Sequence, residues 1–219
     1  MNKLNVLAID DHPVVLDGYQ FMFQNLDHGF KELNFVKAYD CESGFKTINT
    51  TRNEAFNIAL IDYSIPAYPD QNLYSGKDLA LLVRQTAPGC KIIMMTMHRE
   101  ADIIFGVFNT INPEGFINKS DCNTDELMHG FKEVLSGNTF YSKIISNYSS
   151  LQQKGMVLED IDVRIILFLS RGITDIGLSN YVPLNYNEIE KRKEKIKSVL
   201  GVAGSDNDLV NEARAQGYI

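Results

Sequence analysis

Apolar and polar positions along the first 137 residues follow two alternating periods. Short apolar runs have the length of buried strands, and the segments between them carry apolar residues at helical spacing. The expected strands cover Lys3–Ile9, Leu33–Ala38, Phe56–Ile61, Lys91–Met95 and Gly115–Ile117. The expected helices are one that begins at Pro13 and those over Cys41–Ile48, Gly76–Gln85, Glu100–Asn109 and Thr124–Leu135. Strands that alternate with helices predict a five-stranded parallel sheet in a doubly wound α/β domain.

The pattern changes after residue 137. Residues 138–157 are rich in Ser, Asn, Gln and Lys and show no sustained period, which predicts a linker. Only helical patterns follow, over Leu158–Arg171, Thr174–Val182, Tyr186–Leu200 and Asp206–Ala215. We therefore expect an α/β domain over residues 1–137, a linker over 138–157 and a small all-α domain over 158–219.

Composition narrows the class of protein. The longest apolar run, Ile165–Leu169, is far shorter than the roughly 20 residues that a membrane-spanning helix needs. The first ten residues contain Asp10 and do not form a signal peptide. Three widely separated cysteines exclude a disulfide scaffold or a Cys-rich zinc module. These features predict a cytoplasmic protein with no membrane partner.

Charge is distributed unevenly along the chain. The net charge of −7 lies in residues 1–137, which hold 11 Lys and Arg against 18 Asp and Glu, whereas the remaining 82 residues hold 10 of each. The acidic first part excludes broad nucleic-acid binding there, because affinity for phosphates requires local positive charge. The second part has a local cluster of five cations within residues 191–197.

Five polar residues follow the expected strands: Asp10, Asp11, Asp62, Thr96 and Lys119. Because the carboxyl ends of parallel strands form one edge of the sheet, we expect these side chains to converge in one crevice. Three carboxylates brought together repel one another unless a cation neutralises them, and oxygen ligands of this kind suit Mg²⁺. The lysine and the hydroxyl suit a phosphoryl group. The chemistry predicted is a covalent aspartyl phosphate, with a carboxylate as nucleophile.

Four strings of residues resemble a known family. The first part is similar to a response-regulator receiver domain, which implies a flavodoxin-like fold. The whole chain resembles the NarL/FixJ type of response regulator, which adds a LuxR-type helix-turn-helix output domain. The strings are IDDHPVVLDG at 9–18, ALIDYSIP at 59–66, APGCKIIMMTMHRE at 87–100 and GFINKSD at 115–121.

The resemblance implies a role for each residue of the acidic crevice. Asp62 accepts phosphate from a sensor histidine kinase. Asp11, Asp62 and the backbone carbonyl of Ser64 bind Mg²⁺, and Asp10 acts through water. The protein itself is a signalling component rather than an enzyme.

The resemblance also implies a switch. Thr96 and Phe116 match the switch pair of the family, and Lys119 matches its phosphate-contacting lysine. A phosphoryl group adds charge and three acceptor oxygens, which would draw Thr96 inward and let Phe116 rotate into the vacated space. Phosphorylation would then promote homodimer formation or free the output domain.

Two positions depart from the family pattern. Residues 67–75, AYPDQNLYS, make the loop after the acceptor strand several residues longer than is usual. The insertion either alters kinase choice and phosphate lifetime or is inert surface variation, which surface loops tolerate. Asn112 stands where the family commonly has Gly, and Asn tolerates the left-handed conformation.

The helix over Tyr186–Leu200 matches the recognition helix of the output domain. Its apolar positions should face the core, and the base-reading positions of the family correspond to Glu190, Lys191 and Glu194. Acidic residues at base-contacting positions are unusual because DNA phosphates repel them, although Glu can accept a hydrogen bond from cytosine N4. The residues expected to contact DNA are Glu190, Lys191, Arg192, Glu194, Lys195 and Lys197.

Two other functions remain open at this stage. From residue 158 onward the chain contains 8 basic and 10 acidic residues, a net charge that is unfavourable for binding DNA. The helical domain is therefore either a DNA-binding domain or a module that binds a protein partner. An aspartate-nucleophile phosphohydrolase would share the acidic crevice. Tyr63 and Ser64 follow Asp62, so the chain lacks the DxD pair of that enzyme class.

Overall fold

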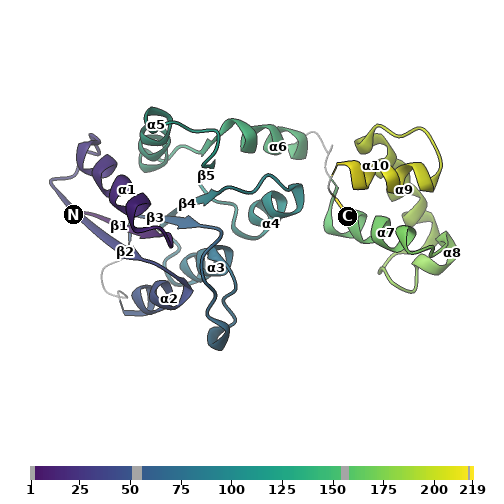
Figure 1. The fold of residues 1–219 in the computed structure, drawn as a ribbon, viewed down its shortest axis with the longest axis horizontal. Helices are drawn as coiled ribbons and strands as arrows, with labels where there is room; N and C mark the ends of the chain where they lie inside the picture. Colours follow the sequence, from purple (N-terminus) through teal and green to yellow (C-terminus); the bar gives the residue numbers. More distant parts are fainter. Residues whose placement is uncertain (1–2, 51–55, 154–157, 217) are drawn as a thin grey trace. The chain divides into compact units, whose positions relative to one another are not determined.

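A computed structural model describes residues 3–50, 56–153, 158–216 and 218–219. The described chain forms two compact units: Met1–Arg99 with Phe105–Ser146, and Glu100–Ile104 with Asn147–Ile219 (Figure 1). The first contains a parallel sheet and the second is helical. Each unit has its own buried apolar core.

The sheet of the first unit has the strand order β2-β1-β3-β4-β5-β6, and every neighbouring pair is parallel. From β1 the chain adds β2 on one side, and it then crosses back to add β3 on the other side of β1. The topological switch point therefore lies between β1 and β3. The strands are β1 (Lys3–Ile9), β2 (Glu32–Ala38), β3 (Ile58–Asp62), β4 (Lys91–Thr96), β5 (Gly115–Asn118) and β6 (Phe140–Tyr141).

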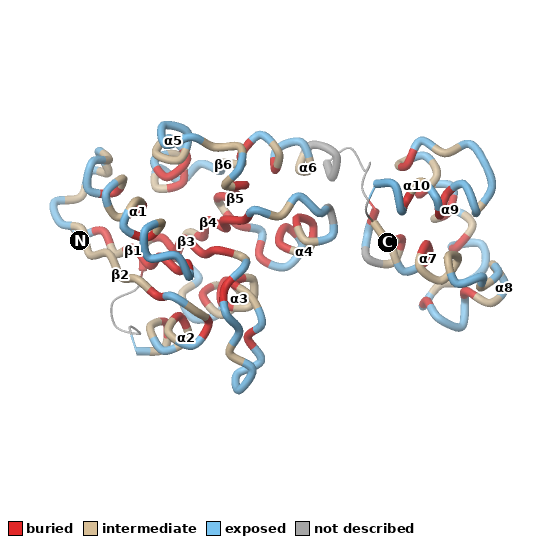
Figure 2. The backbone as a smooth tube through the Cα atoms, viewed as in Figure 1, coloured by how far each residue is buried: buried red, intermediate tan, exposed pale blue. Residues whose placement is uncertain are grey.

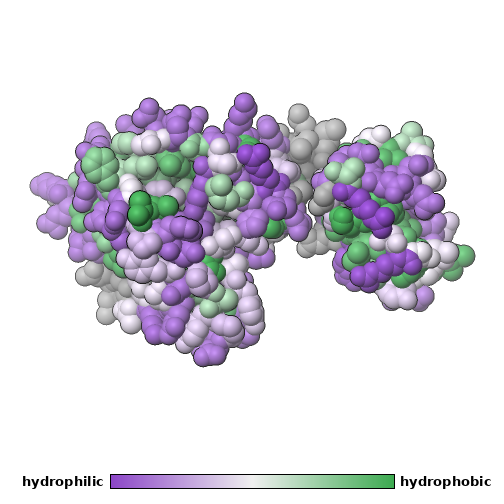
Figure 3. All heavy atoms as spheres, viewed as in Figure 1, coloured by the Kyte–Doolittle hydropathy of each residue, from purple (hydrophilic) through white to green (hydrophobic). Residues whose placement is uncertain are grey.

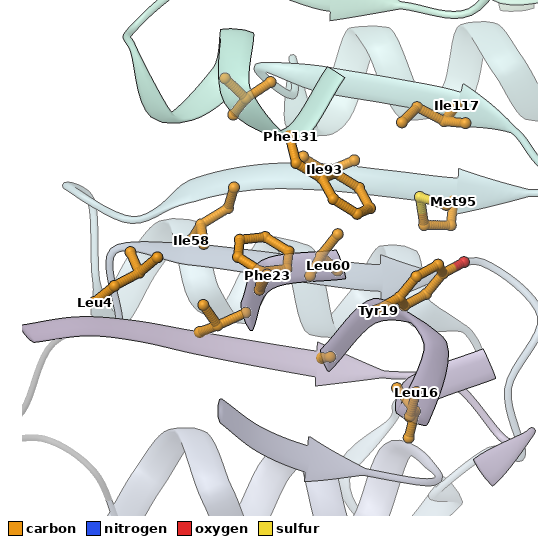
Figure 4. Packing of buried hydrophobic residues seen from close by; sticks show 13 residues of the cluster. Leu4, Leu16, Tyr19, Phe23, Ile58, Leu60, Ile93, Met95, Ile117 and Phe131 are labelled. Atoms are coloured by element: carbon orange, nitrogen blue, oxygen red, sulfur yellow. The ribbon is translucent and has the colours of Figure 1, made fainter. Parts of the chain in front are cut away.

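Helices cover both faces of this sheet. Alternate residues of β1, β3, β4 and β5 pack against α1 and α5, where Phe23 and Phe131 stack with ring centroids 5.0 Å apart (Figure 4). The central strands are buried almost throughout, as Figure 2 shows. Burial of apolar side chains on both faces is what fixes the carboxyl ends of these strands in place. The helices are α1 (Pro13–Asn25), α2 (Cys41–Thr50), α3 (Gly76–Thr86), α4 (Ala101–Ile111) and α5 (Thr124–Leu135).

The segment after Gly137 differs from its sequence-based prediction. Residues 138–157 were expected to be a linker beside a five-stranded sheet, but Phe140–Tyr141 form a sixth strand and Lys143–Gln153 form helix α6. Two residues are too few to produce a period in the sequence, and the strand exists because β5 offers a free edge. Residues 154–157 lie outside the described residues. The domain boundaries themselves remain a prediction.

The described part of residues 158–219 forms four helices around an apolar cluster that includes Ile165, Ile189, Ile196 and Leu209. The predicted helix over Thr174–Val182 is wrong in length, because only Asp175–Leu178 is helical. Glycine has the lowest helix propensity of the residues in this segment, and Gly177 lies within the short helix. Beyond Leu178 the backbone forms turns. The helices are α7 (Asp160–Ser170), α8 (Asp175–Leu178), α9 (Tyr186–Leu200) and α10 (Asp206–Ala215).

The insertion at 67–75 closes on itself. Tyr68 and Leu73 form an isolated antiparallel bridge with N–O distances of 2.7 and 3.2 Å, and a 3-10 turn (η1, Pro69–Gln71) lies between them. Asn72 ends this turn in the left-handed conformation. Leu73 is buried and the Tyr68 ring contacts Phe45 of α2, so the added residues form an ordered hairpin.

The surface is mostly hydrophilic on the face shown in Figure 3, with small apolar areas between charged side chains. Within the described part of the chain, no helix combines the length and apolarity needed to cross a membrane. Asn112 adopts a positive φ of 47°, as its substitution for Gly predicts.

Candidate functional site

Four of the residues predicted from the sequence stand at the carboxyl edge of the sheet. Asp10 directly follows β1, Asp62 ends β3, Thr96 ends β4 and Lys119 directly follows β5. The side chains of Asp10, Asp62 and Thr96 are buried. Parallel pairing places Asp62 opposite Met95, and Thr96 opposite the residue that precedes Lys119. The sheet topology therefore gathers three polar side chains on the inner strands and a cation on the strand beside them.

Lys119 joins the two buried carboxylates. Its Nζ lies 2.6 Å from Asp10 Oδ2 and 2.8 Å from Asp62 Oδ1. Burial lowers the pKa of Lys119, but the hydrogen bonds to both carboxylates outweigh it and the pKa is raised overall. Burial raises the pKa of Asp62, and Lys119 opposes this shift. The crevice thus contains two buried carboxylates and a single ammonium group, a surplus of negative charge that favours a further cation.

Asp11 and His12 extend the acidic crevice toward solvent. Ligand atoms of Asp10, Asp11 and His12 all lie within 4.8 Å of one another, close enough to surround one ion. His12 Nδ1 is 2.7 Å from Asp11 Oδ1, and its backbone N–H donates to Asp10 Oδ1 at 2.9 Å. The carboxylates of Asp10, Asp11 and Asp62 form a set of hard oxygen donors, so the residues present fit Mg²⁺.

The loop after Asp62 is held by backbone contacts that the sequence analysis did not identify. Gly76, the first residue of α3, donates its N–H to Tyr63 O at 2.9 Å. A Cβ at Gly76 would lie only 1.8 Å from the backbone oxygen of Asp62, so no other residue fits without displacing the chain. The reason for this glycine is close approach, which spacing along the sequence does not reveal.

His98 lies beside the loop that follows Asp62, a position that the sequence analysis did not identify. Its Nε2 is 3.0 Å from Ser64 Oγ, and its ring makes an edge contact with Tyr63. Its backbone N–H donates to Thr96 Oγ1 at 2.9 Å. The loops after β3 and β4 are therefore connected through one residue.

Phe116 is fully buried in β5, as a core residue would be. Its ring meets Phe108 of α4 at 5.4 Å between centroids, and Phe108 in turn meets Tyr141 of β6 at 5.2 Å. The predicted switch residue thus belongs to an aromatic group that links α4, β5 and β6. Its role as a switch remains a prediction.

Two cations predicted to contact DNA make ion pairs within the helical unit. Arg192 lies 2.8 Å from Asp162 and 3.0 Å from Glu159, and Lys195 lies 2.6 Å from Glu159. Both carboxylates belong to the capping box at the start of α7. Asp162 is fully buried, so these pairs fasten α9 to α7.

Lys193 makes a second set of ion pairs on α9. Its Nζ is 2.7 Å from Asp175 and 2.7 Å from Asp206, and 3.3 Å from Glu190. Burial lowers the pKa of Lys193, but the hydrogen bonds to Asp175 and Asp206 outweigh it and raise the pKa overall. This buried cation joins α8, α9 and α10, and the sequence analysis did not single it out.

The remaining predicted DNA contacts face solvent to different degrees. Lys197 lies 3.7 Å from the exposed Glu194 and 3.9 Å from Asp206. Lys191 is exposed and makes no ion pair among the residues that the structure describes. The outward face of α9 therefore combines one unpaired cation with carboxylates.

Residues 6–132 match the family model for the response regulator receiver domain, which spans more than half of the chain. The chain belongs to this family. Its strand order and the buried aspartates at the carboxyl edge of the sheet agree with the fold that the family resemblance implied.

This response regulator is similar to curated transcriptional regulators. It is 28% identical over 141 residues to the transcriptional regulatory protein MctR of Rhizobium johnstonii, a match that covers 64% of this chain and 59% of MctR. It is 23% identical to the transcriptional regulatory protein RcsB of Escherichia coli K12 over 215 residues, which cover 95% of this chain and 92% of RcsB.

Solved structures show the same fold over both units of the response regulator. RcsB of Salmonella enterica serovar Typhimurium, bound to promoter P1flhDC in the presence of the phosphomimetic BeF₃⁻, aligns with a TM-score of 0.59 at 21% identity. The alignment covers 97% of this chain and 98% of RcsB. The likeness therefore extends past the receiver into the helical unit.

Proposed function

We propose that this response regulator is phosphorylated on Asp62 by a sensor histidine kinase and that its helical unit binds DNA to regulate transcription. The observation that supports the proposal most directly is the pairing of Lys119 with Asp10 and Asp62 at the carboxyl edge of a receiver fold. A carboxylate at this edge of the sheet lies where ligands of open α/β folds bind, and a phosphodonor would approach from there.

The transfer requires a nucleophile and a fixed positive charge. The carboxylate of Asp62 would attack the phosphorus of the phosphohistidine, so an O–P bond forms, the N–P bond breaks and the imidazole of the donor leaves. Lys119 already contacts Asp62 Oδ1 at 2.8 Å, which leaves the other carboxylate oxygen for the attack. The same ammonium group would then stabilise the charge of the transferred phosphoryl group.

Magnesium would be held by Asp11, Asp62 and the backbone carbonyl of Ser64, with Asp10 acting through water. When bound, the ion neutralises charge on the phosphoryl oxygens. Asp10 and Asp62 are buried and share only one lysine, which supports a requirement for a second cation at this position.

Phosphorylation would act on the output through Thr96, Lys119 and Phe116. In the structure the Thr96 hydroxyl accepts a hydrogen bond from the His98 backbone, and reorientation toward a phosphoryl group would break this bond. The likeness to RcsB, which has been solved with promoter DNA, supports DNA as the target of the helical unit and a homodimer as the active form. A protein partner in place of DNA has no such support.

Labelling by acetyl phosphate tests the receiver. The wild-type chain should acquire one acid-stable, base-labile phosphoryl group in the presence of Mg²⁺, and Asp62→Asn should acquire none. Asp70→Asn, a change of one exposed carboxylate in the nearby hairpin, is the matched control and should label normally. Equal labelling of Asp62→Asn and wild type would refute the assignment of the acceptor.

Selection from a random duplex DNA pool tests the output. With beryllofluoride and Mg²⁺ we expect enrichment of a short inverted motif, stronger than without the phosphoryl mimic. The selection should be repeated at two salt concentrations, because nonspecific binding falls steeply with salt. Normal labelling of Asp62 without any enrichment at low salt would instead identify the helical unit as a protein-binding module.

A further inference from the structure

Buried polar side chains in the first unit form a connected group. Asp10, Asp62 and Thr96 stand at the carboxyl edge of the sheet, and the other two buried polar residues among those described in the first unit are Asn118 and Ser142. Asn118 directly precedes Lys119, and Ser142 directly precedes α6. Buried polar groups persist only where they are hydrogen-bonded, so the partners of these two residues carry the argument.

Ser142 continues the pairing of β6 with β5 after β6 has ended. Its backbone N–H donates to Phe116 O at 3.1 Å, and its Oγ accepts the backbone N–H of Asn118 at 3.0 Å. Its own carbonyl accepts the N–H of Ser146 at 2.7 Å within the first turn of α6. The side chain of Ser142 therefore takes the place of a strand residue as hydrogen-bond partner of β5, and its backbone carbonyl accepts the first hydrogen bond of α6.

Asn118 connects the same point to the loop that follows Thr96. Its Nδ2 donates to His98 O at 2.6 Å, and the Lys119 backbone N–H donates to Thr96 O at 2.7 Å. A second contact ties α6 to this region, because Asp121 accepts the backbone N–H of Ile144. The start of α6 is thus hydrogen-bonded to the segment that contains Lys119.

We propose that Asn118 and Ser142 are positioning residues that couple the occupancy of Asp62 to the first turn of α6. The proposal rests on the proposed function. A phosphoryl group on Asp62 would draw the Lys119 ammonium away from Asp10, and the backbone of Asn118 would move with it. The Asn118 N–H is buried, and it either keeps its hydrogen bond to Ser142 Oγ or is left unsatisfied, which costs free energy. The two possibilities define two discrete states of the region.

Amide hydrogen exchange of the full chain tests this coupling. Beryllofluoride with Mg²⁺ should speed exchange across residues 143–149 of the wild type about fivefold or more, the lower range of allosteric coupling, and leave α2 unchanged. Ser142→Ala should exchange fast in α6 with or without the mimic. Ser142→Thr, which keeps the hydroxyl, should restore the response. Lys143→Gln changes an exposed side chain of the same helix and should respond like the wild type.

The outcomes separate the coupling from the proposed function. Failure of acetyl phosphate to label Asp62 would refute the proposed function. Normal labelling with no change at 143–149 in the wild type would refute the coupling alone, as would a normal response in Ser142→Ala. Coupling between two sites is reciprocal. The factor by which beryllofluoride speeds exchange in α6 of the wild type should therefore equal the factor by which Ser142→Ala changes the affinity for beryllofluoride. If Ser142→Ala does not fold, the wild-type comparison of α6 with α2 and the response of Ser142→Thr decide the question.

Discussion

Each unit of the protein contains a lysine that pairs with two aspartates, but the two clusters differ in where the aspartates come from. Lys119 pairs with Asp10 and Asp62, which stand at the ends of neighbouring strands, whereas Lys193 pairs with Asp175 and Asp206, which belong to separate helices. The distances are nearly the same, between 2.6 and 2.8 Å. Contact geometry alone therefore does not distinguish a reactive site from a structural one.

The two lysines differ in whether the surrounding elements depend on their ion pairs. At the sheet edge the aspartates stand at the ends of β1 and β3, and the direct pairing of these strands already holds them in place. Around Lys193, three carboxylates surround the cation and the pairs themselves hold α8, α9 and α10 together. Lys119 is not needed to hold secondary-structure elements together, so it is available to bind a ligand. Lys193 joins three helices and is not available in this way.

Replacing Lys193 gives the largest expected effect. Lys193→Met leaves Asp175 and Asp206 without their buried partner. Their side chains keep 30% and 34% of their exposure, so we expect a cost of about 3 kcal/mol, the lower end of the range for a buried pair. The free energy of opening measured by amide exchange in α9 should fall by that amount. Lys191→Met removes the same charge from an exposed position of the same helix and should stay within about 0.5 kcal/mol. Equal effects of the two changes would contradict a structural role for Lys193.

Gly76 tests how tightly the carboxyl edge of the sheet is held beside Asp62. In Gly76→Ala the added Cβ would overlap the backbone oxygen of Asp62, so the start of α3 must shift. We expect a loss of about 3 kcal/mol in the unfolding free energy of the first unit, together with slower labelling by acetyl phosphate. Gly89→Ala is the control, because a Cβ there meets no atom within 4 Å. Unchanged labelling in Gly76→Ala would show that the edge tolerates displacement.

Asp62 should lower stability when it is charged. Burial raises its folded pKa above the usual value of 3.8, so the folded state holds its proton more tightly than the unfolded state does. Below the usual value both states are protonated, and as pH rises through the folded pKa the wild type must ionise a buried group. Asp62→Asn should therefore be more stable than the wild type at neutral pH without Mg²⁺, and the difference should disappear below the usual pKa of the carboxyl group. Thermal unfolding across this range measures the difference, and a wild type more stable at neutral pH would reverse the sign.

Paired and unpaired cations on α9 should differ slightly in DNA binding. Lys191→Ala should reduce the slope of log K against log salt by about 0.9, the value for one phosphate contact. Arg192 already pairs with Glu159 and Asp162, so Arg192→Ala should leave the slope unchanged. Fluorescence anisotropy with a selected duplex measures both slopes. A slope change in Arg192→Ala would show that its ion pairs open on DNA.

Much of the fold was predictable because local sequence and burial agree. The strands β1 to β5 read as apolar runs, and the position of Asp10 and Asp62 follows from where those runs end. The sequence did not predict β6, whose two residues are strand only because β5 presents an edge, or the role of Gly76, which depends on a contact with another segment. The pairing of Arg192 with Asp162, 30 positions apart, likewise requires the packed helices.

The hairpin at 67–75 makes the receiver suitable for engineering. Because Tyr68 and Leu73 close its base and Leu73 is anchored, the four positions between them can vary in length without transmitting strain to Asp62. A short epitope or a fluorophore-binding peptide inserted between Asp70 and Gln71 would report on the protein while the carboxyl edge of the sheet keeps its geometry. Lengthening of a closed loop costs only about 0.6 kcal/mol per doubling, so the insertion site adds a reporter at little expense to folding.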